Sequence, residues 1–205
     1  MNKSSIILIN DPKTKTIFPS RAFVDTNVIL DLYLNRKHKN DWISFLGQAT
    51  KNGTEFIYTL HSLREVRNVL NFQIHDKKAK ELQIKGAKPW KTLENSTRHN
   101  FSRIVATETA KVNDLLKSAG FKFETVENNS EIFELENLYS TKYDLGPGDA
   151  AIAATMDSLK VNSICTDDSG FFKTDNFNVY SPTEKAFKVS KTRNNSFKEF
   201  RTIKQ

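Results

Sequence analysis

The stretch Arg21–Asn27, which reads RAFVDTN, decides the fold of this chain. The apolar residues Ala22–Val24 predict a short buried strand, and apolar residues at helical spacing follow from about Val28. Asp25 therefore stands directly after a strand, where an open parallel sheet binds its ligands. An Asp in this place also serves as an ordinary helix N-cap, and the residue taken alone favours that structural role.

Strands and helices alternate in the chain after this stretch. The pattern predicts further strands and helices at Phe56–Thr59 (strand), Leu60–Phe72 (helix), Asp149–Leu159 (helix), Ser163–Thr166 (strand) and Phe177–Tyr180 (strand). The third of these follows a Gly-Pro-Gly turn, residues 146–148. Such alternation predicts an α/β fold of three layers, α/β/α, with a mainly parallel central sheet.

The middle of the chain is helical and basic. Helices are predicted at Lys77–Lys85, Glu94–Lys117 and Glu131–Leu138, and residues 73–122 hold eleven Lys and Arg against five Asp and Glu. A solvated helical face and a nucleic-acid surface are equally good interpretations of this charge. We predict one domain over residues 1–183, with residues 73–143 as a helical basic insertion. Residues 184–205 form a basic tail with seven Lys and Arg and two Glu.

Composition narrows the class of protein. The 205 residues carry a net charge of +7, with 38% hydrophobic and 27% charged residues, which is typical of a globular domain with affinity for polyanions. The longest apolar run is far too short to cross a membrane, so we expect no membrane segment. The single cysteine, Cys165, excludes an internal disulfide. A cytoplasmic location is the expectation that fits best.

Further acids follow Asp25 along the chain. Glu65 lies in the helix after the second strand, Asp149 begins a helix rich in alanine, and Asp167 and Asp168 directly follow the strand at Ser163–Thr166. Each has an ordinary structural explanation when taken alone. If they lay close together they would lower the stability of the fold, since two like charges about 4 Å apart repel by roughly 4 kcal/mol at an effective dielectric of 20. A hard divalent cation, Mg²⁺ or Mn²⁺, would offset that repulsion.

The ordered set of motifs resembles the PIN-domain family, including VapC-type toxins. Residues 24–30 (VDTNVIL) look like its opening motif, Glu65 matches its helical acid, and residues 148–154 (GDAAIAA) match its Asp-Ala-x-Ile-Ala-Ala element. Residues 166–171 (TDDSGF) match its Thr-x-Asp-x-x-Phe strand end, which makes Asp168 the expected ligand and Asp167 its neighbour. The segment between Glu65 and Asp149 is longer than in compact members, and the basic tail is additional.

The resemblance implies a metal-dependent endoribonuclease that hydrolyses RNA phosphodiester bonds, with Mg²⁺ or Mn²⁺ as cofactor. Asp25, Asp149 and Asp168 would hold the metal, with Asp167 as a further ligand, and Glu65 would hold a second metal or orient the attacking water. Asn27 and Thr166 would fix the carboxylates by hydrogen bonds. Toxin, RNA-processing and defence roles stay open. RNA, an antitoxin or inhibitor protein and a second copy of the chain are the implied partners.

Two alternatives are weighed against this interpretation. A non-catalytic RNA-binding or scaffold protein of the same fold would keep the sheet without the chemistry. A haloacid-dehalogenase-like phosphatase would also place an Asp after the first strand, but it requires a second Asp where this chain has Asn27. Lys88, Trp90 and Lys91 are candidate substrate contacts, because Trp90 is an aromatic residue set among basic ones.

Overall fold

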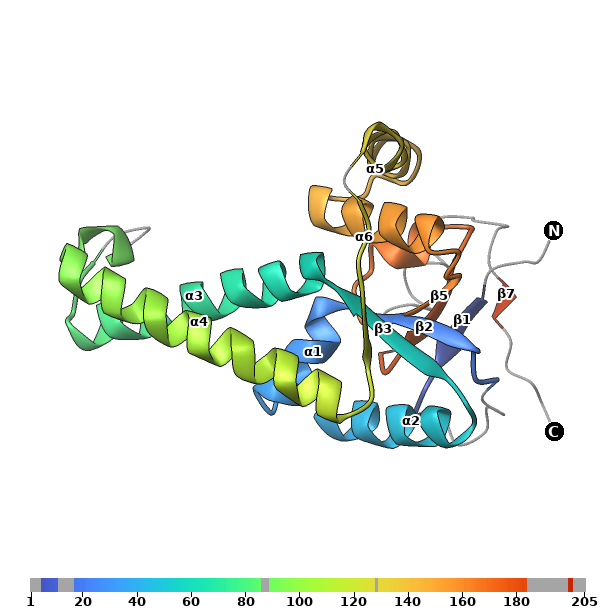
Figure 1. The fold of residues 1–205 in the computed structure, drawn as a ribbon, viewed down its shortest axis with the longest axis horizontal. Coiled ribbons are helices and arrows are strands. Elements are labelled where there is room, and N and C mark those ends of the chain that lie inside the picture. Colours follow the sequence, from blue (N-terminus) through green and yellow to red (C-terminus); the bar gives the residue numbers. More distant parts are fainter. Residues whose placement is uncertain (1–4, 11–16, 86–88, 128, 184–198, 201–205) are drawn as a thin grey trace.

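A seven-stranded parallel sheet forms the centre of the computed structural model (Figure 1). Residues 5–10, 17–85, 89–127, 129–183 and 199–200 are described, with only the backbone of residues 89–90 and 199–200. The strands are β1 (Ser5–Leu8), β2 (Arg21–Val24), β3 (Glu55–Thr59), β4 (Lys122–Glu124), β5 (Ser163–Cys165), β6 (Asn178–Ser181) and β7 (Glu199–Phe200). Their order is β4-β3-β2-β5-β6-β1-β7, and every neighbouring pair is parallel.

Helices cover both faces of this sheet, as three-layer α/β/α proteins require. They are α1 (Thr26–Tyr33), α2 (Lys39–Lys51), α3 (Leu60–Glu81), α4 (Asn95–Ser118), α5 (Ser130–Tyr143) and α6 (Pro147–Ser158), with short 3₁₀ turns η1 (Pro89–Thr92) and η2 (Phe171–Lys173). Side chains of β2 alternate between two cores: Ala22 and Val24 pack with α1–α4, while Phe23 packs with α5 and α6. The predicted fold class is confirmed.

Two strands lie where the sequence gives little strand signal. β1 is a run of four residues that pairs with β6, and β4 is an edge strand of three residues. Lys122 and Phe123 of β4 are exposed, so the strand lacks the buried apolar pattern on which sequence prediction depends. β4 lies within residues 73–143, for which only helices were predicted.

The predicted helices at residues 60–72 and 77–85 are one continuous helix, α3. His75, between the two predicted helices, is buried in the structure, as is Ala79 in the second of them. α3 and α4 pack along one another as a long hairpin that projects from the sheet, with η1 near its far end (Figure 1). Helix α6 begins at Pro147, a residue that suits the first turn of a helix, rather than at Asp149.

Part of the predicted basic tail belongs to the sheet. Glu199–Phe200 forms β7 and pairs with Ser5 and Ile6 of β1. Residues 184–198 and 201–205 of that tail lie outside the described residues. None of the helices among the described residues combines the length and the apolar character that a membrane span requires.

Candidate active site

The sheet topology brings the predicted acids toward one edge. β2 lies between β3 and β5, and Val24 of β2 pairs with Cys165 of β5. The next residues along each strand, Asp25 and Thr166, therefore emerge side by side at the carboxyl ends of the two strands. After β2 the chain continues to β3, which pairs with one edge of β2, while β5 pairs with the other edge of β2. This is the switch point where open α/β sheets bind ligands.

Asp25 is held by a dense set of hydrogen bonds. Its carboxylate is buried, and its Oδ1 accepts from the backbone N–H of Thr26 at 2.6 Å. Its Oδ2 accepts from Asn27 Nδ2 at 2.8 Å and from Thr166 Oγ1 at 2.5 Å. Thr166 Oγ1 also accepts from the backbone N–H of Asp168 at 2.9 Å. Asp25 is thus both the N-cap of α1 and the centre of a fixed polar cluster, so the two interpretations of this residue hold together.

Glu65 reaches the same cluster from the first turns of α3. Thr26 Oγ1 donates to Glu65 Oε2 at 2.7 Å, which links the helix after β3 to the start of the helix after β2. The other oxygen, Oε1, lies 3.9 Å from His61 Nε2, too far for a hydrogen bond. The family resemblance predicted that Asn27 and Thr166 fix the carboxylates by hydrogen bonds. Thr26 is an additional one that spacing alone could not reveal.

Asp149 and Asp168 approach each other across a glycine. A Cβ on Gly170 would lie 2.9 Å from Asp149 Oδ2 and 3.2 Å from Asp168 Oδ1. The backbone N–H of Gly170 also donates to Asp168 Oδ1 at 2.7 Å. Gly148, in the first turn of α6, gives similar room to Glu65, whose Oε1 would lie 2.7 Å from a Cβ there. These glycines keep space open between the acids that any other side chain would fill.

Burial and mutual repulsion raise the pKa of two of the acids. Burial raises the pKa of Asp25 to about 7, and the charges of Asp149 and Glu65 act in the same direction against the hydrogen bonds from Thr166 and Thr26. Burial also raises the pKa of Asp149 to about 6, followed by the charges of Asp168 and Glu65. The four predicted acids, Asp25, Glu65, Asp149 and Asp168, therefore interact as one electrostatic group.

Asp167 faces a different neighbour. After burial, the charge of Asp167 is the largest influence that raises the pKa of Asp31, a buried residue of α1. Asp167 is not among the charges that shift the pKa of Asp25 or Asp149. Its assignment as a further metal ligand stays a prediction, with Asp168 in the better position.

The donor set suits a hard divalent cation. Four carboxylates supply only oxygen ligands, and two of them are desolvated enough that a cation would lower the cost of their charge. The side-chain positions do not form a closed ligand shell: among the described residues, no three or more His, Cys, Asp or Glu groups are arranged to hold a metal ion. The acids fit the metal by the chemistry of their oxygen donors.

The candidate substrate contacts are placed only in part. Lys88 lies outside the described residues, and only the backbone of Trp90 is described. Lys91 is exposed in η1, at the far end of the α3–α4 hairpin and away from the acids. A contact between these residues and substrate stays a prediction.

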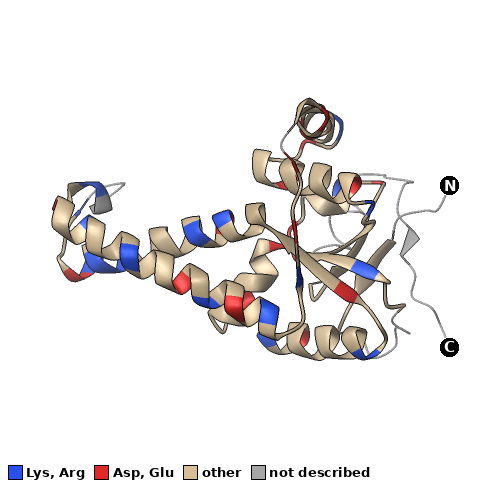
Figure 2. Ribbon diagram, viewed as in Figure 1, with Lys and Arg blue, Asp and Glu red and all other residues tan. Residues whose placement is uncertain are grey.

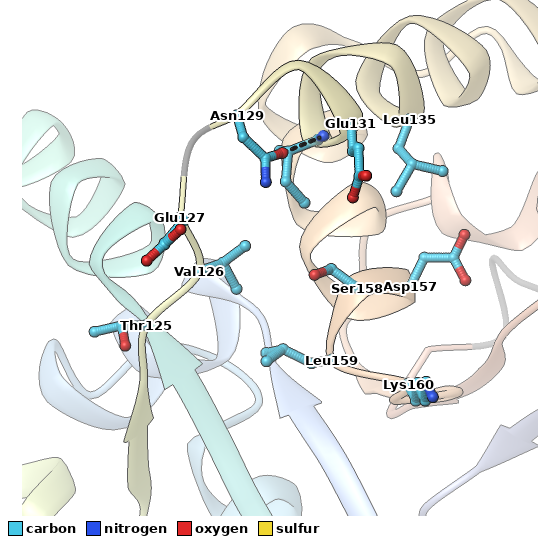
Figure 3. Close-up of a pocket in the computed structure, with 11 residues that line it drawn as sticks. Thr125, Val126, Glu127, Asn129, Glu131, Leu135, Asp157, Ser158, Leu159 and Lys160 are labelled. Atoms are coloured by element: carbon cyan, nitrogen blue, oxygen red, sulfur yellow. Dashed lines mark hydrogen bonds between the residues drawn. The ribbon is translucent and has the colours of Figure 1, made fainter.

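The structure contains a cavity away from the acids that the sequence did not predict. It measures about 520 Å³ and lies between the segment after β4 and the carboxyl end of α6 (Figure 3). Glu127, Glu131, Asp157 and Lys160 contribute polar groups to its wall. Asp149 and Asp157 lie eight residues apart on α6, which corresponds to about 12 Å along a helix. This cavity is therefore separate from the acidic site.

Comparison with known proteins identifies the class. Residues 22–176 match the family model described as PIN domain, so this chain belongs to the PIN-domain family. That span contains all four acids. This match argues against the alternative of a haloacid-dehalogenase-like phosphatase, which the position of Asp25 after the first strand had suggested.

Solved structures with a similar fold include two bacterial complexes. One is VapBC2 from Rickettsia felis bound to a DNA fragment from its promoter, at a TM-score of 0.48 and 13% identity, covering 78% of this chain and 98% of that one. The other is a toxin–antitoxin complex from Klebsiella pneumoniae, at 0.42 and 17% identity, covering 80% and 98%. The comparison with curated proteins found no match.

Proposed function

We propose that this protein is a Mg²⁺- or Mn²⁺-dependent endoribonuclease whose active site is formed by Asp25, Glu65, Asp149 and Asp168. The observation that carries this proposal is the electrostatic coupling of these acids at the carboxyl edge of the sheet. Burial and each other's charge raise the pKa values of Asp25 and Asp149. Carboxyl groups with pKa values raised by burial and by each other's charge cluster at functional sites.

Asp25, Asp149 and Asp168 would hold the metal through carboxylate oxygens. A bound metal ion supplies an activated water at neutral pH and offsets the negative charge that develops on the phosphate. Asn27 and Thr166 fix the Asp25 carboxylate through its Oδ2. The Gly170 N–H fixes Asp168 through its Oδ1.

Glu65 has one oxygen for positioning and one for chemistry. Thr26 holds Oε2, so Oε1 is left to accept a hydrogen bond from the attacking water or to bind a second metal. In the hydrolysis, water gives its hydroxyl to phosphorus, the phosphorus–oxygen bond to the leaving ribose breaks, and the leaving oxygen gains a proton. A carboxylate that accepts a proton from water is a general base for this step.

The test is cleavage of a mixed RNA pool by the purified chain with Mg²⁺, Mn²⁺ or EDTA. Asp149→Asn should lower the cleavage rate by on the order of a hundred- to a thousandfold, since it removes one anionic oxygen ligand of the metal that would offset the charge developing on the phosphate. Asp157→Asn is the matched control, because Asp157 is an exposed acid at the other end of the same helix. It should cleave at the wild-type rate.

Metal-dependent cutting that Asp149→Asn loses and Asp157→Asn keeps would support both the activity and the site. Absence of cutting under every metal condition, from folded wild-type protein, would favour the non-catalytic scaffold alternative. Equal cutting by both variants would assign the activity elsewhere or to a contaminant. An antitoxin or inhibitor protein and a homodimer remain predictions of the sequence resemblance.

A further inference from the structure

A second polar pocket lies in the α3–α4 hairpin, outside the acidic site. It has a volume of about 540 Å³, and its wall includes Asn71 and His75 of α3, Lys91 of η1, and Arg98 and His99 of α4. The wall contains no carboxylate among the described residues. A volume of this size is within the range of small-ligand sites. The chemistry of the wall is therefore that of an anion site.

The cations of this pocket are available to a ligand. Lys91 and Arg98 are exposed, and within the described part of the chain neither forms an ion pair with a carboxylate. Arg98 Nη2 donates to Asn95 Oδ1, which leaves further guanidinium N–H groups for a ligand. By contrast, Lys78 and Lys80 on the same hairpin pair with Glu81 and Asp76.

His75 forms a buried part of the pocket wall. The residue is 6% exposed, and its Nδ1 lies 2.9 Å from the carbonyl oxygen of Asn71, so this nitrogen carries the hydrogen. The ring packs edge-on against Phe101, with centroids 5.5 Å apart. Its Nε2 has no hydrogen-bond partner among the described residues. With the hydrogen on Nδ1, Nε2 is an acceptor, so it does not bind a phosphate oxygen, and the anion contacts of the pocket come from Lys91 and Arg98.

We propose that this pocket binds a backbone phosphate of the RNA that the acidic site cuts, with Lys91 and Arg98 as the main contacts. The inference rests on the proposed function. It also rests on position, since His75 lies ten residues beyond Glu65 on α3, about 15 Å along the helix axis. A strand bound at the acids and extended along the hairpin passes the pocket a few nucleotides away.

The charge of the hairpin favours a polyanion over an isolated anion. Lys and Arg outnumber Asp and Glu by eleven to five in residues 73–122. Figure 2 shows that Lys and Arg positions predominate over Asp and Glu positions in the outer part of the hairpin. RNA gains affinity from such a surface through release of its counterions, so binding must weaken as salt rises. The pocket supplies a fixed phosphate position on that surface.

Binding is measured by fluorescence anisotropy with a labelled single-stranded RNA of mixed sequence, in EDTA, over a series of KCl concentrations. The full chain carries Asp149→Asn throughout, so that the probe stays intact. The test variant adds Lys91→Gln and Arg98→Gln. The control adds Lys51→Gln and Lys117→Gln, which remove the same charge from exposed positions outside the pocket. Thermal melts establish that both fold.

The test variant should bind RNA at least about tenfold more weakly than the control at low salt, and its salt slope should fall by about 0.7, the value for one phosphate contact on a single strand. Inorganic phosphate should compete with RNA in the control and lose that effect in the test variant. Equal affinities of test and control variants would overturn the proposal. Poly-glutamate that displaces RNA as well as unlabelled RNA does would also overturn it, in favour of an acidic protein segment.

The two proposals fail in different ways. If the wild type cuts RNA but loss of Lys91 and Arg98 changes neither binding nor cutting, the nuclease assignment stands and the phosphate pocket falls. If the wild type cuts nothing while RNA binding depends on both residues, the pocket stands and the nuclease assignment falls.

Discussion

The acidic site and the α3–α4 hairpin handle like charges in opposite ways. At the site, Asp25 is 5% exposed and shares one edge of the sheet with other carboxylates, which raises its pKa. On the hairpin, Lys91 and Arg98 are exposed and spread over a surface. Concentrated buried charge costs folding free energy, while dispersed exposed charge costs little because water and salt screen it. The difference indicates that the acids are arranged for chemistry and the cations for binding.

The largest expected effect on stability comes from Asp25→Asn. The pKa of Asp25 is about 7 in the fold against 3.8 for the free side chain, so the folded protein holds this proton more tightly than the unfolded chain does. The resulting stability is fully present below about pH 4 and is lost as pH rises through about 7. At pH 8 without metal, Asp25→Asn should therefore be more stable than wild type, by on the order of 2–4 kcal/mol.

Urea unfolding at pH 4 and pH 8 in EDTA measures this effect. The advantage of Asp25→Asn should be present at pH 8 and absent at pH 4, and added Mg²⁺ should stabilise the wild type more than the variant. Arg98→Gln is the control from the hairpin, where the free energy of unfolding should change by less than about 0.5 kcal/mol at either pH. If Asp25→Asn is less stable than wild type at pH 8, the charge of Asp25 does not cost folding free energy as proposed.

Gly170→Ala tests the acidic site, because it fills the space between Asp149 and Asp168. The added Cβ would lie 2.9 Å from Asp149 Oδ2 and 3.2 Å from Asp168 Oδ1, in a backbone conformation that alanine adopts freely. Metal affinity, measured by calorimetric titration with Mn²⁺, should fall by roughly ten- to a hundredfold, as it does when the surroundings of a metal ligand are disturbed.

Gly47→Ala is the matched control for Gly170→Ala. Gly47 lies in α2, where an added Cβ would meet nothing within 4 Å. The change should therefore leave metal affinity untouched and raise stability by about 1 kcal/mol through helix propensity. Mn²⁺ affinity of Gly170→Ala equal to that of Gly47→Ala would show that the space between Asp149 and Asp168 is not used.

The smallest expected effect is that of Thr26→Val, which keeps shape and removes the hydroxyl that holds Glu65 Oε2. Loss of one hydrogen bond to a charged group, worth about 1.5–3 kcal/mol, should slow cleavage by roughly ten- to a hundredfold at most while RNA binding in EDTA stays unchanged. Thr26→Ser should restore most of the rate. A rate in Thr26→Val equal to that of wild type would show that Glu65 needs no such positioning.

Sequence reasoning predicted most of the sheet and proposed the four acids, whose role as a site stays a prediction. It succeeded at β2, β3 and β5, because each is a buried apolar run next to a helical pattern. It failed at β4, whose residues are largely exposed and gain strand structure only by pairing with β3. It also divided α3 in two, because the contacts that bury His75 and Ala79 come from another helix. Long-range contacts of this kind leave no mark on local periodicity.

The sequence by itself determined the order of the acids, the parallel α/β class and the basic character of the hairpin, since these follow from residue type and spacing. The contacts between individual side-chain atoms depend on the tertiary structure. It placed the Thr26 hydroxyl on Glu65, left Gly170 between Asp149 and Asp168, and set His75, with no partner for its Nε2 among the described residues, beside the cations of a pocket. The physical reason is that hydrogen bonds and charge interactions depend on distances between side chains, which packing of distant elements fixes.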